Sequence, residues 1–432
     1  MGLLAKVTRE TPVEISADFL EHLFAGYPRR DFLVRFWDGS SWGAADQPRF
    51  TLVLRHPGAL RAMFLNPSEL TLGEAYIYND FDIEGDIEAA LEMGEHLLSQ
   101  DHGLGERLHL GTILGKLPPQ GRPRAVLRPR KLRGAVHSKS RDRQAVTYHY
   151  DLPAEFYRLF LDRRMIYSCA YFQHLDESLD AAQEHKLDYL CRKLRLRPGE
   201  RLLDIGCGWG ALIIHAAAHY GVQALGITLS EPQAELARQR IREAGLEDKC
   251  SAKVRDYRDL DGREQFDKIV SVGMFEHVGE ALLPEYFTRA WRLLQPGGVF
   301  LNHGIAYSAI YHRRGLSFVD RYVFPDGDMV PINTSLHAAE HSGFEVRDVE
   351  SLREHYALTL HHWVQRLEGN AEQARSITDD TTYRIWRLYM TGSAHAFRTG
   401  RLNLYQALLA KPAGGRSGLP LTRGDWYCSY EA

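Results

Sequence analysis

The 432-residue chain contains 44% hydrophobic and 25% charged residues and carries a formal net charge of −3, a composition typical of globular domains. A chain of this length exceeds one ordinary hydrophobic core, so we expect two domains. The sequence contains no apolar run near the roughly 18 residues that span a bilayer, no apolar signal-peptide core at its charged N-terminus, and no excess of positive charge that would indicate a nucleic-acid-binding protein.

The first predicted unit is a small α+β domain over residues 1–115. Phe32–Trp37 and Phe50–Leu54 have the composition of strands. Ala59–Leu65 is predicted to be a short helix, and Asp86–Leu98 places apolar residues on one helical face. This unit contains no catalytic constellation of side chains.

Residues 116–143 are predicted to form a basic, proline-rich linker rather than a helix. The stretch contains ten Lys or Arg, one acidic residue and prolines at positions 118, 119, 123 and 129. It therefore carries a charge of +9, and the rest of the chain carries −12. Such a segment is either a solvated spacer or a contact for anionic lipid headgroups or nucleic acid, and nothing else in the sequence favours nucleic acid.

The second predicted unit begins near residue 144 and alternates strands with helices. Gln183–Leu194 has one apolar helical face, and Ala211–His219 is the helix after the first strand. The predicted strands are Leu202–Ile205, Ala224–Ile227, Ala252–Val254, Lys268–Val272 and Val299–His303. This alternation predicts a doubly wound, parallel α/β sheet, in which ligands bind at the carboxyl ends of the strands.

The most informative local pattern is Asp-x-Gly-x-Gly-x-Gly, formed by Asp204, Gly206, Gly208 and Gly210. It joins a predicted buried strand to a helix, and its glycines permit a tight turn close to a nucleotide-like ligand. A dinucleotide fingerprint is spaced Gly-x-Gly-x-x-Gly and has an acid about 20 residues further on. Both features are missing: the third glycine follows the second by two residues instead of three, and no acid follows the next strand, which runs into Thr228-Leu229-Ser230. The pattern argues against NAD and favours S-adenosylmethionine over a ligand-free structural turn.

Further motifs flank this turn in a fixed order along the chain. They are Tyr148-His149-Tyr150-Asp151-Leu152, Met165-Ile166-Tyr167-Ser168-Cys169-Ala170-Tyr171-Phe172, Gly273-Met274-Phe275-Glu276-His277-Val278-Gly279, Phe324-Pro325-Asp326-Gly327 and Gly400-Arg401-Leu402-Asn403. With this set the chain resembles the cyclopropane-fatty-acyl-phospholipid synthase family, a branch of the class I S-adenosylmethionine-dependent methyltransferases. The resemblance covers nearly the whole chain. It implies a Rossmann-like, doubly wound α/β catalytic domain over residues 144–432 and a smaller α+β N-terminal domain that engages lipid.

The resemblance also implies which residues bind S-adenosylmethionine. The glycine turn would hold the amino-acid moiety, two residues before the turn would close over the cofactor, and two later loops would contact ribose and adenine. The implied set is Tyr167, Ser168, Asp204, Gly206, Gly208, Gly210, Thr228, Leu229, Ser230, Gln233, Asp256 and Tyr257. Ser230 also precedes Gln233 by three residues, a helix-capping pattern that is compatible with ligand binding at the same helix N-terminus.

Methyl transfer to a cis alkene leaves a carbocation, and a base must remove a proton from the new methyl group before a ring closes. A carboxylate beside the cationic sulfonium has a lowered pKa and is a weak base. The family resemblance implies a bound bicarbonate ion as the base. The residues implied to hold this ion are Cys169, Glu276, His303, Ile305 (through its backbone) and Tyr356.

Several of these residues also have simpler structural explanations. A cysteine between Ser and Ala beside aromatic residues is most often a packed small side chain, so Cys169 is not expected to be a covalent nucleophile. A single histidine after a strand, such as His277, more often packs than reacts. Glu276 follows an apolar strand and needs a partner if buried, which His303 or the ion would supply. Ser393 stands where many relatives carry cysteine, and we expect no catalytic role for it.

Location and partners follow from cysteine usage and from the expected substrate. The five cysteines, at positions 169, 191, 207, 250 and 428, have neither metal-ligand spacing nor a disulfide framework. We therefore expect a reducing, cytoplasmic location and no metal. The expected partner is an unsaturated phospholipid, reached by peripheral association with anionic headgroups on the inner face of the membrane. The family resemblance is also compatible with a homodimer.

The sequence thus predicts an enzyme that transfers a methyl group from S-adenosylmethionine to the cis double bond of a phospholipid acyl chain and forms a cyclopropane ring. One alternative keeps the fold and changes the product to a methylene- or methyl-branched chain. A second alternative is a lipid-binding protein with a silent methyltransferase domain, against which the intact glycine turn and Glu276 argue.

Overall fold

The computed structural model describes residues 10–43, 46–100, 103–119, 132–150, 152–310 and 317–427. The chain divides into two compact units, called here the N-terminal unit and the C-terminal unit. The first comprises Met1–Pro129, Gly315–Phe318 and Asp379–His395, and the second comprises Arg130–Arg314, Val319–Thr378 and Ala396–Ala432. Two short segments beyond residue 144 therefore belong to the N-terminal unit, whereas the sequence boundaries assign them to the catalytic domain.

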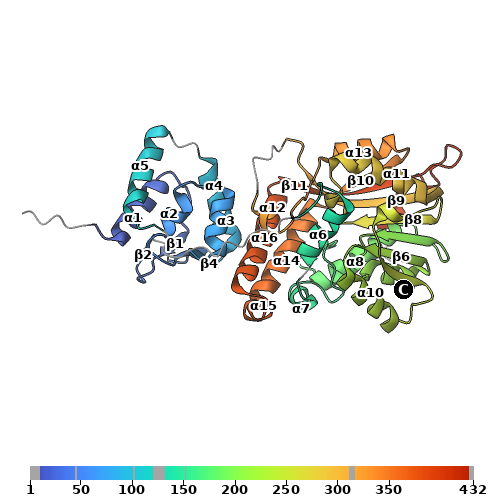
Figure 1. The fold of residues 1–432 in the computed structure, drawn as a ribbon, viewed down its shortest axis with the longest axis horizontal. Helices are drawn as coiled ribbons and strands as arrows, with labels where there is room; N and C mark the ends of the chain where they lie inside the picture. The colour runs from blue at the N-terminus through green and yellow to red at the C-terminus, as the bar shows by residue number, and fades with distance from the viewer. Residues whose placement is uncertain are drawn as a thin grey trace, which may run out of the picture. The chain divides into compact units, whose positions relative to one another are not determined.

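A four-stranded sheet with flanking helices forms the N-terminal unit (Figure 1). Its strands are β1 (Phe32–Arg35), β2 (Ser41–Trp42), β3 (Phe50–Leu54) and β4 (Phe81–Gly85). Their order is β2-β1-β3-β4, with β1 and β3 parallel and the other pairs antiparallel. Its first helices are α1 (Pro12–Leu23), α2 (Ala59–Phe64), α3 (Glu69–Ile77), α4 (Ile87–Ser99) and α5 (Leu104–Lys116). The predicted strands and helices of this region are confirmed within two residues.

The first part of α16 (Asp380–Arg398) belongs to this unit because its arginines are buried against it. Arg384 donates to Asp82 Oδ2 at 2.7 Å, and its guanidinium carbon lies 5.1 Å from the ring centroid of Tyr76. Arg387 donates to the hydroxyl of the same Tyr76 at 2.8 Å. Contacts between residues about 300 positions apart cannot be predicted from local sequence patterns.

A seven-stranded sheet in the order β10-β11-β9-β8-β5-β6-β7 is the centre of the C-terminal unit (Figure 1). Its strands are β5 (Arg201–Ile205), β6 (Gln223–Thr228), β7 (Cys250–Val254), β8 (Phe266–Val272), β9 (Leu294–Tyr307), β10 (Glu345–Ser351) and β11 (Leu402–Ala410). All five predicted strands are present, and their pairs are parallel as predicted. The sheet as a whole is mixed, because β11 runs antiparallel to both β9 and β10.

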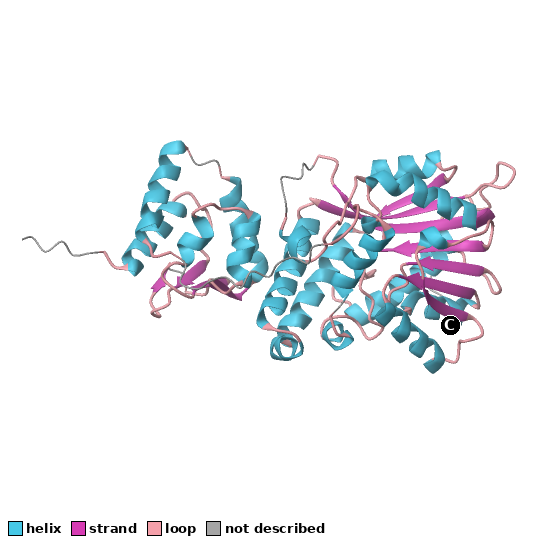
Figure 2. Ribbon diagram, viewed as in Figure 1, coloured by secondary structure: helices cyan, strands magenta, loops and turns pink. Residues whose placement is uncertain are grey.

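Helices cover both faces of this sheet and bury a separate apolar core on each face (Figure 2). One core includes side chains of α8 (Leu179–Leu194), α9 (Ala211–Tyr220) and α10 (Glu231–Glu243). The other includes side chains of α11 (Leu283–Leu293) and α13 (Ile332–His341). Strand residues alternate between the two cores, as the two-residue period of a β-strand requires.

The remaining helices of the C-terminal unit precede, interrupt or follow the strand–helix alternation along the chain. They are α6 (Lys139–Tyr150), α7 (Ala154–Arg158), α12 (Phe318–Tyr322), α14 (Arg353–Gly369), α15 (Ala371–Ile377) and α17 (Gly424–Tyr427), with the 3₁₀ turns η1 (Tyr257–Asp259), η2 (Phe275–His277) and η3 (Glu280–Leu282). Among the described residues, no helix is both long and apolar enough to cross a membrane.

The basic linker predicted over residues 116–143 is helical at both of its ends. Lys116 is the last residue of α5, and Lys139–Arg143 form the beginning of α6. Pro118 and Pro119 follow α5 and are not helical. Residues 120–131, which carry five of the ten cations, lie outside the described residues.

Candidate functional site

The glycine turn after β5 has the geometry that its sequence predicts. Gly206, Gly208 and Gly210 have φ angles of 93°, 52° and 84°, all in the region that favours glycine. A Cβ atom on Gly206 would lie 2.9 Å from Met274 Cβ, and one on Gly210 would lie 3.0 Å from Ala237 Cβ. At Gly208 no atom lies within 4 Å of that position. The first and third glycines are therefore also needed for packing, whereas the second faces open space.

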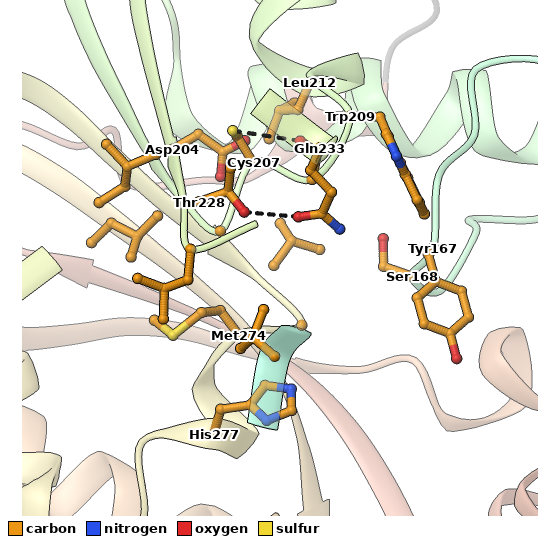
Figure 3. A pocket seen from close by; sticks show the side chains of 18 of the residues that line it. Tyr167, Ser168, Asp204, Cys207, Trp209, Leu212, Thr228, Gln233, Met274 and His277 are labelled. Carbon is orange, nitrogen blue, oxygen red and sulfur yellow. Dashed lines mark hydrogen bonds between the residues drawn. The ribbon is translucent and has the colours of Figure 1, made fainter. Parts of the chain in front are cut away.

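A pocket lies at the carboxyl ends of the parallel strands, where the alternating topology predicts a ligand (Figure 3). The empty space within it, including open solvent at its mouth, is about 1200 Å³. Among the predicted cofactor residues, those that line it are Tyr167, Ser168, Asp204, Gly206, Gly208, Thr228, Leu229, Gln233, Asp256 and Tyr257. Segments up to 90 residues apart in sequence thus meet at one site.

Two predicted cofactor residues, Gly210 and Ser230, do not line this pocket. Both are N-cap residues: Gly210 precedes α9, and Ser230 precedes α10. Ser230 Oγ accepts the backbone N–H of Gln233 at 3.4 Å. The helix-capping explanation is therefore confirmed for Ser230. Gln233 itself points into the pocket, where its Oε1 accepts the hydroxyl of Thr228 at 2.7 Å (Figure 3).

Asp204 and Lys186 are two buried ionisable groups that line the pocket. Asp204 is 3% exposed, and its Oδ1 has no hydrogen-bond partner. Burial raises the pKa of Asp204 to about 7 and lowers the pKa of Lys186 to about 8. Lys186 Nζ donates to Ser168 Oγ at 3.0 Å. A buried carboxylate oxygen without a partner fits the cationic amino group of S-adenosylmethionine.

Arg258 also lines the pocket and was not among the predicted residues. Its guanidinium donates to both carboxylate oxygens of Asp256, from Nε at 2.9 Å and from Nη2 at 2.6 Å. Nη2 also donates to Asp142 Oδ2 of α6 at 2.8 Å. All three residues line the pocket, so Arg258 joins the loop after β7 to the helix that passes over it. In the sequence, the only local sign of this role is that Arg258 stands two residues after the predicted cofactor residue Asp256.

One cluster lies at the contact between η2 and β9, where Glu276 binds the backbone of Ile305 and His303 stands two residues earlier on the same strand. Glu276 Oε1 accepts the backbone N–H of Ile305 at 2.6 Å, and its Oε2 has no hydrogen-bond partner. His303 Nδ1 lies 3.1 Å from Gln406 Nε2, and its Nε2 has no partner. Burial raises the pKa of Glu276 to about 7 and lowers the pKa of His303 well below its usual value. The cluster therefore contains two buried polar atoms that a further group can satisfy.

Cys169 and Tyr356 form a second cluster, at the start of α14. Cys169 Sγ donates to the carbonyl of Leu352 at 3.9 Å, and the same carbonyl accepts the backbone N–H of Tyr356 at 3.1 Å. Burial raises the pKa of Cys169, so the thiol stays protonated, in agreement with the expectation that it is no covalent nucleophile. Tyr356 is linked to the cofactor pocket through Trp363, whose ring lies 6.1 Å from Tyr356 and 5.2 Å from Tyr167.

None of the five implied catalytic residues lines the cofactor pocket directly. Cys169, however, follows the pocket residue Ser168, and Glu276 precedes the pocket residue His277. The two clusters thus adjoin the pocket from different loops. Burial lowers the pKa of His277 to about 4, so this histidine is a neutral part of the wall.

Comparisons with known proteins agree with this architecture. A model of the mycolic acid cyclopropane synthetase family matches residues 137–407, and a model described as a domain of unknown function matches residues 19–96. The chain is 42% identical to a probable fatty acid methyltransferase of Pseudomonas putida over 399 residues, which cover 91% of this chain and 95% of that protein.

Two further similarities concern the reaction product and the cofactor. The chain is 32% identical to the tuberculostearic acid methyltransferase UfaA1 of Mycobacterium tuberculosis, over 87% of this chain and 86% of that protein. Among solved structures, it is similar to the mycolic acid cyclopropane synthase CmaA1 in complex with SAH and CTAB. That match has a TM-score of 0.59 and 36% identity, and it covers 62% of this chain and 97% of the other.

Proposed function

The chain belongs to the mycolic acid cyclopropane synthetase family of S-adenosylmethionine-dependent methyltransferases, and on that premise we propose that it converts the cis double bond of a phospholipid acyl chain into a cyclopropane ring. The observation that carries the proposal is two buried side chains next to the cofactor pocket, Glu276 of η2 and His303 of β9, on two elements that contact each other. Each side chain has one polar atom without a partner. A methyltransferase whose product loses its proton to solvent needs no proton acceptor inside the protein. It therefore has no need of two buried polar atoms without partners.

The reaction places two demands on the protein. S-adenosylmethionine supplies the methyl group: the alkene π electrons form a bond to that carbon, and the sulfur–carbon bond breaks. The resulting carbocation loses a proton from the new methyl group, and the electrons of that C–H bond close the ring. The site must therefore hold the sulfonium against an apolar chain and keep one proton acceptor within reach of the cation.

The free atoms of Glu276 and His303 fit a small oxyanion. Because Oε1 of Glu276 already accepts the N–H of Ile305, a proton on this carboxyl group resides on Oε2. With the pKa of Glu276 at about 7, that protonated form is populated near neutral pH, so Oε2–H can donate to an anion. Bicarbonate bound there would supply the proton acceptor. Cys169, in the segment before α8, and Tyr356, in α14, complete the same proposed site.

A second product class is favoured by one specific similarity. The relative UfaA1 is named a tuberculostearic acid methyltransferase, and that name denotes a methyl-branched rather than a cyclopropane product. The same carbocation gives a methylene branch if a hydride first shifts from the methyl-bearing carbon to the cationic carbon and the new methyl group then loses a proton, and a methyl branch after a later reduction. A base already fixed beside the new methyl group removes its proton before a hydride shifts, and the ring then closes, which is why we place cyclopropanation first.

The phospholipid substrate and a peripheral membrane location belong to the proposal as well. The ten cations between Lys116 and Arg143 belong to a chain that is otherwise acidic. Each Lys or Arg near an anionic surface contributes about 1 kcal/mol of binding. A few such contacts would hold the protein reversibly on the membrane that contains its substrate.

Transfer of a labelled methyl group tests the substrate assignment. The protein is incubated with methyl-labelled S-adenosylmethionine and either vesicles of cis-monounsaturated phosphatidylglycerol or the corresponding free fatty acid. We expect label in the acyl chains of the intact phospholipid, and we expect the rate to fall in CO₂-free buffer and to recover on addition of bicarbonate. Label in the free fatty acid alone would refute the phospholipid substrate. A rate indifferent to bicarbonate would refute the bound ion.

A further inference from the structure

Three strands place a row of polar side chains beside His303. Glu350 of β10 pairs with Gln406 of β11, and Gln406 pairs with His303 of β9. His303 and Gln406 are 1% and 0% exposed, so their polar atoms must be satisfied within the protein. Gln406 Nε2 and His303 Nδ1 are 3.1 Å apart. The row therefore reaches the candidate catalytic histidine from the side opposite to its free Nε2.

A buried lysine from α8 completes this row. Lys193 is 0% exposed, and its Nζ donates to Glu350 Oε2 at 2.7 Å and to Gln406 Oε1 at 3.0 Å. The rings of Tyr189 and Trp426 lie 5.0 and 5.2 Å from the same Nζ. The carboxylate and the two ring faces compensate the charge of this buried ammonium group.

The lysine determines which way the amide of Gln406 faces. A lysine ammonium has three donors and no acceptor, so the atom of Gln406 that faces Lys193 must be the oxygen. The NH₂ group of Gln406 then faces His303, where it can only donate. Nδ1 of His303 is therefore the acceptor and carries no proton. In a neutral imidazole the single proton then resides on Nε2, the atom that has no partner.

We propose that Lys193 and Gln406 are positioning residues that hold His303 as its neutral Nε2–H tautomer and so direct one N–H donor into the anion site. The proposal rests on the proposed function for the identity of that site, but the tautomer itself follows from the hydrogen bonds alone. Burial and the nearby charges of Lys186 and Lys193 lower the pKa of His303, which agrees with a neutral ring. A fixed donor costs no reorganisation when an anion binds.

The substitution Gln406→Glu tests the proposal with almost no change in size. A glutamate still accepts from Lys193, but it presents a carboxylate oxygen to His303 Nδ1 in place of a donor. The imidazole must then carry its proton on Nδ1. We expect kcat for methyl transfer to fall on the order of 100-fold, whereas the affinity for S-adenosylhomocysteine and the KM for S-adenosylmethionine stay within about twofold, because Gln406 does not line the cofactor pocket.

Asn302→Asp is the matched control. Asn302 is the buried neighbour of His303 on β9, and its Oδ1 accepts the hydroxyl of Tyr286 at 3.0 Å. The substitution makes the same amide-to-carboxylate change beside His303 but on the opposite face of the strand, and it preserves the acceptor. We expect methyl transfer within about threefold of wild type. An equal loss in both variants would show that a buried acid anywhere in this sheet is damaging, and would overturn the proposal.

Nitrogen-15 NMR of labelled histidine reads the tautomer directly, because protonated and unprotonated imidazole nitrogens have well-separated shifts. The signal of His303 is assigned as the one lost in His303→Gln. We expect Nε2 protonated in the wild type and Nδ1 protonated in Gln406→Glu. Protonated Nδ1 in the wild type would overturn the proposal, even if the variant does not fold. A wild-type protein with the expected tautomer but no methyl transfer to lipid would instead refute the proposed function.

Discussion

The backbone N–H of Ile305 donates to Oε1 of Glu276 at 2.6 Å, which leaves Oε2 of this buried carboxyl group without a hydrogen-bond partner. One oxygen is thus held by β9 while the other is available to a bound group. The same contact fixes the orientation of the side chain, because η2 and β9 are separate elements joined at this point. A buried carboxyl oxygen left available in this way is what the proposed anion site requires.

Glu276→Gln is expected to abolish most activity and to leave cofactor binding intact. The amide keeps the acceptor for Ile305 and a donor toward the bound ion, but it cannot exchange a proton with that ion during turnover, so we expect kcat to fall on the order of 100-fold. Glu276 does not line the cofactor pocket, and calorimetry should give S-adenosylhomocysteine affinities within about twofold of wild type. Glu280→Gln, the same change at an exposed position of η3, is the control. Normal turnover by the Glu276 variant would remove this residue from the mechanism.

The raised pKa of Glu276 also has a consequence for stability. Burial lifts the pKa from 4.5 to about 7, so the folded state binds a proton that the unfolded state releases between those pH values. The favourable contribution is fully present below pH 4.5 and is lost as the pH rises through about 7. The free energy of unfolding of the wild type should therefore fall relative to Glu276→Gln by up to about 3 kcal/mol between pH 5 and 8. Urea unfolding at both pH values measures this difference, and a constant difference would contradict it.

Gly208→Ala tests the cofactor pocket better than a change at the first glycine. A Cβ atom at Gly206 would meet Met274 and disturb packing, whereas at Gly208 it meets only open space within the pocket wall. We expect the affinity for S-adenosylhomocysteine to fall about tenfold or more, because the added methyl group occupies ligand space. Gly245→Ala is the control, since it has a similar positive φ of 66° and also meets no atom within 4 Å. Equal affinities in both variants would mean that the turn does not contact the ligand.

The basic segment between the two units predicts a salt-dependent affinity for anionic vesicles. Replacing Arg128, Arg130, Lys131 and Arg133 with glutamine removes four of its ten cations. We expect weaker binding to anionic vesicles and a flatter salt dependence, because each cation contributes about 1 kcal/mol near such a surface and salt screens it over roughly 10 Å at 0.1 M. Co-sedimentation with vesicles measures both. Unchanged binding would assign the lipid contact to the N-terminal unit, and activity on detergent-dispersed lipid should stay near normal in either case.

The sequence predicts those parts of the fold that have a local signal. Strands β5 to β9 and the turn at Gly206 follow from apolar runs, helical periodicity and glycine spacing, and the structure confirms them. The antiparallel strand β11 was not predicted, because its apolar run follows a long helix instead of continuing the strand–helix alternation. That omission matters, since β11 contributes Gln406.

In the candidate site, too, the residues with a local sequence signal were predicted and those that depend on distant contacts were not. Residues that share a short motif with the family, such as Glu276, were identified, whereas Lys186, Lys193 and Arg258 were not. The apolar face of α8 was recognised from its leucines, but the two lysines beside that face were not distinguished from solvated charges. Their partners lie on strands distant in sequence: Lys193 contacts residues 157 and 213 positions away. Only the folded sheet shows that these ammonium groups are buried.

The most direct test of the account is the structure of the lipid product. The protein is incubated with S-adenosylmethionine and vesicles of cis-monounsaturated phosphatidylglycerol, and the released fatty acids are analysed by mass spectrometry and proton NMR. The account predicts a gain of one CH₂ group, loss of the alkene protons and appearance of cyclopropane protons at high field. A product that retains a double bond as a methylene branch on the acyl chain, or a saturated methyl-branched chain, would contradict cyclopropanation.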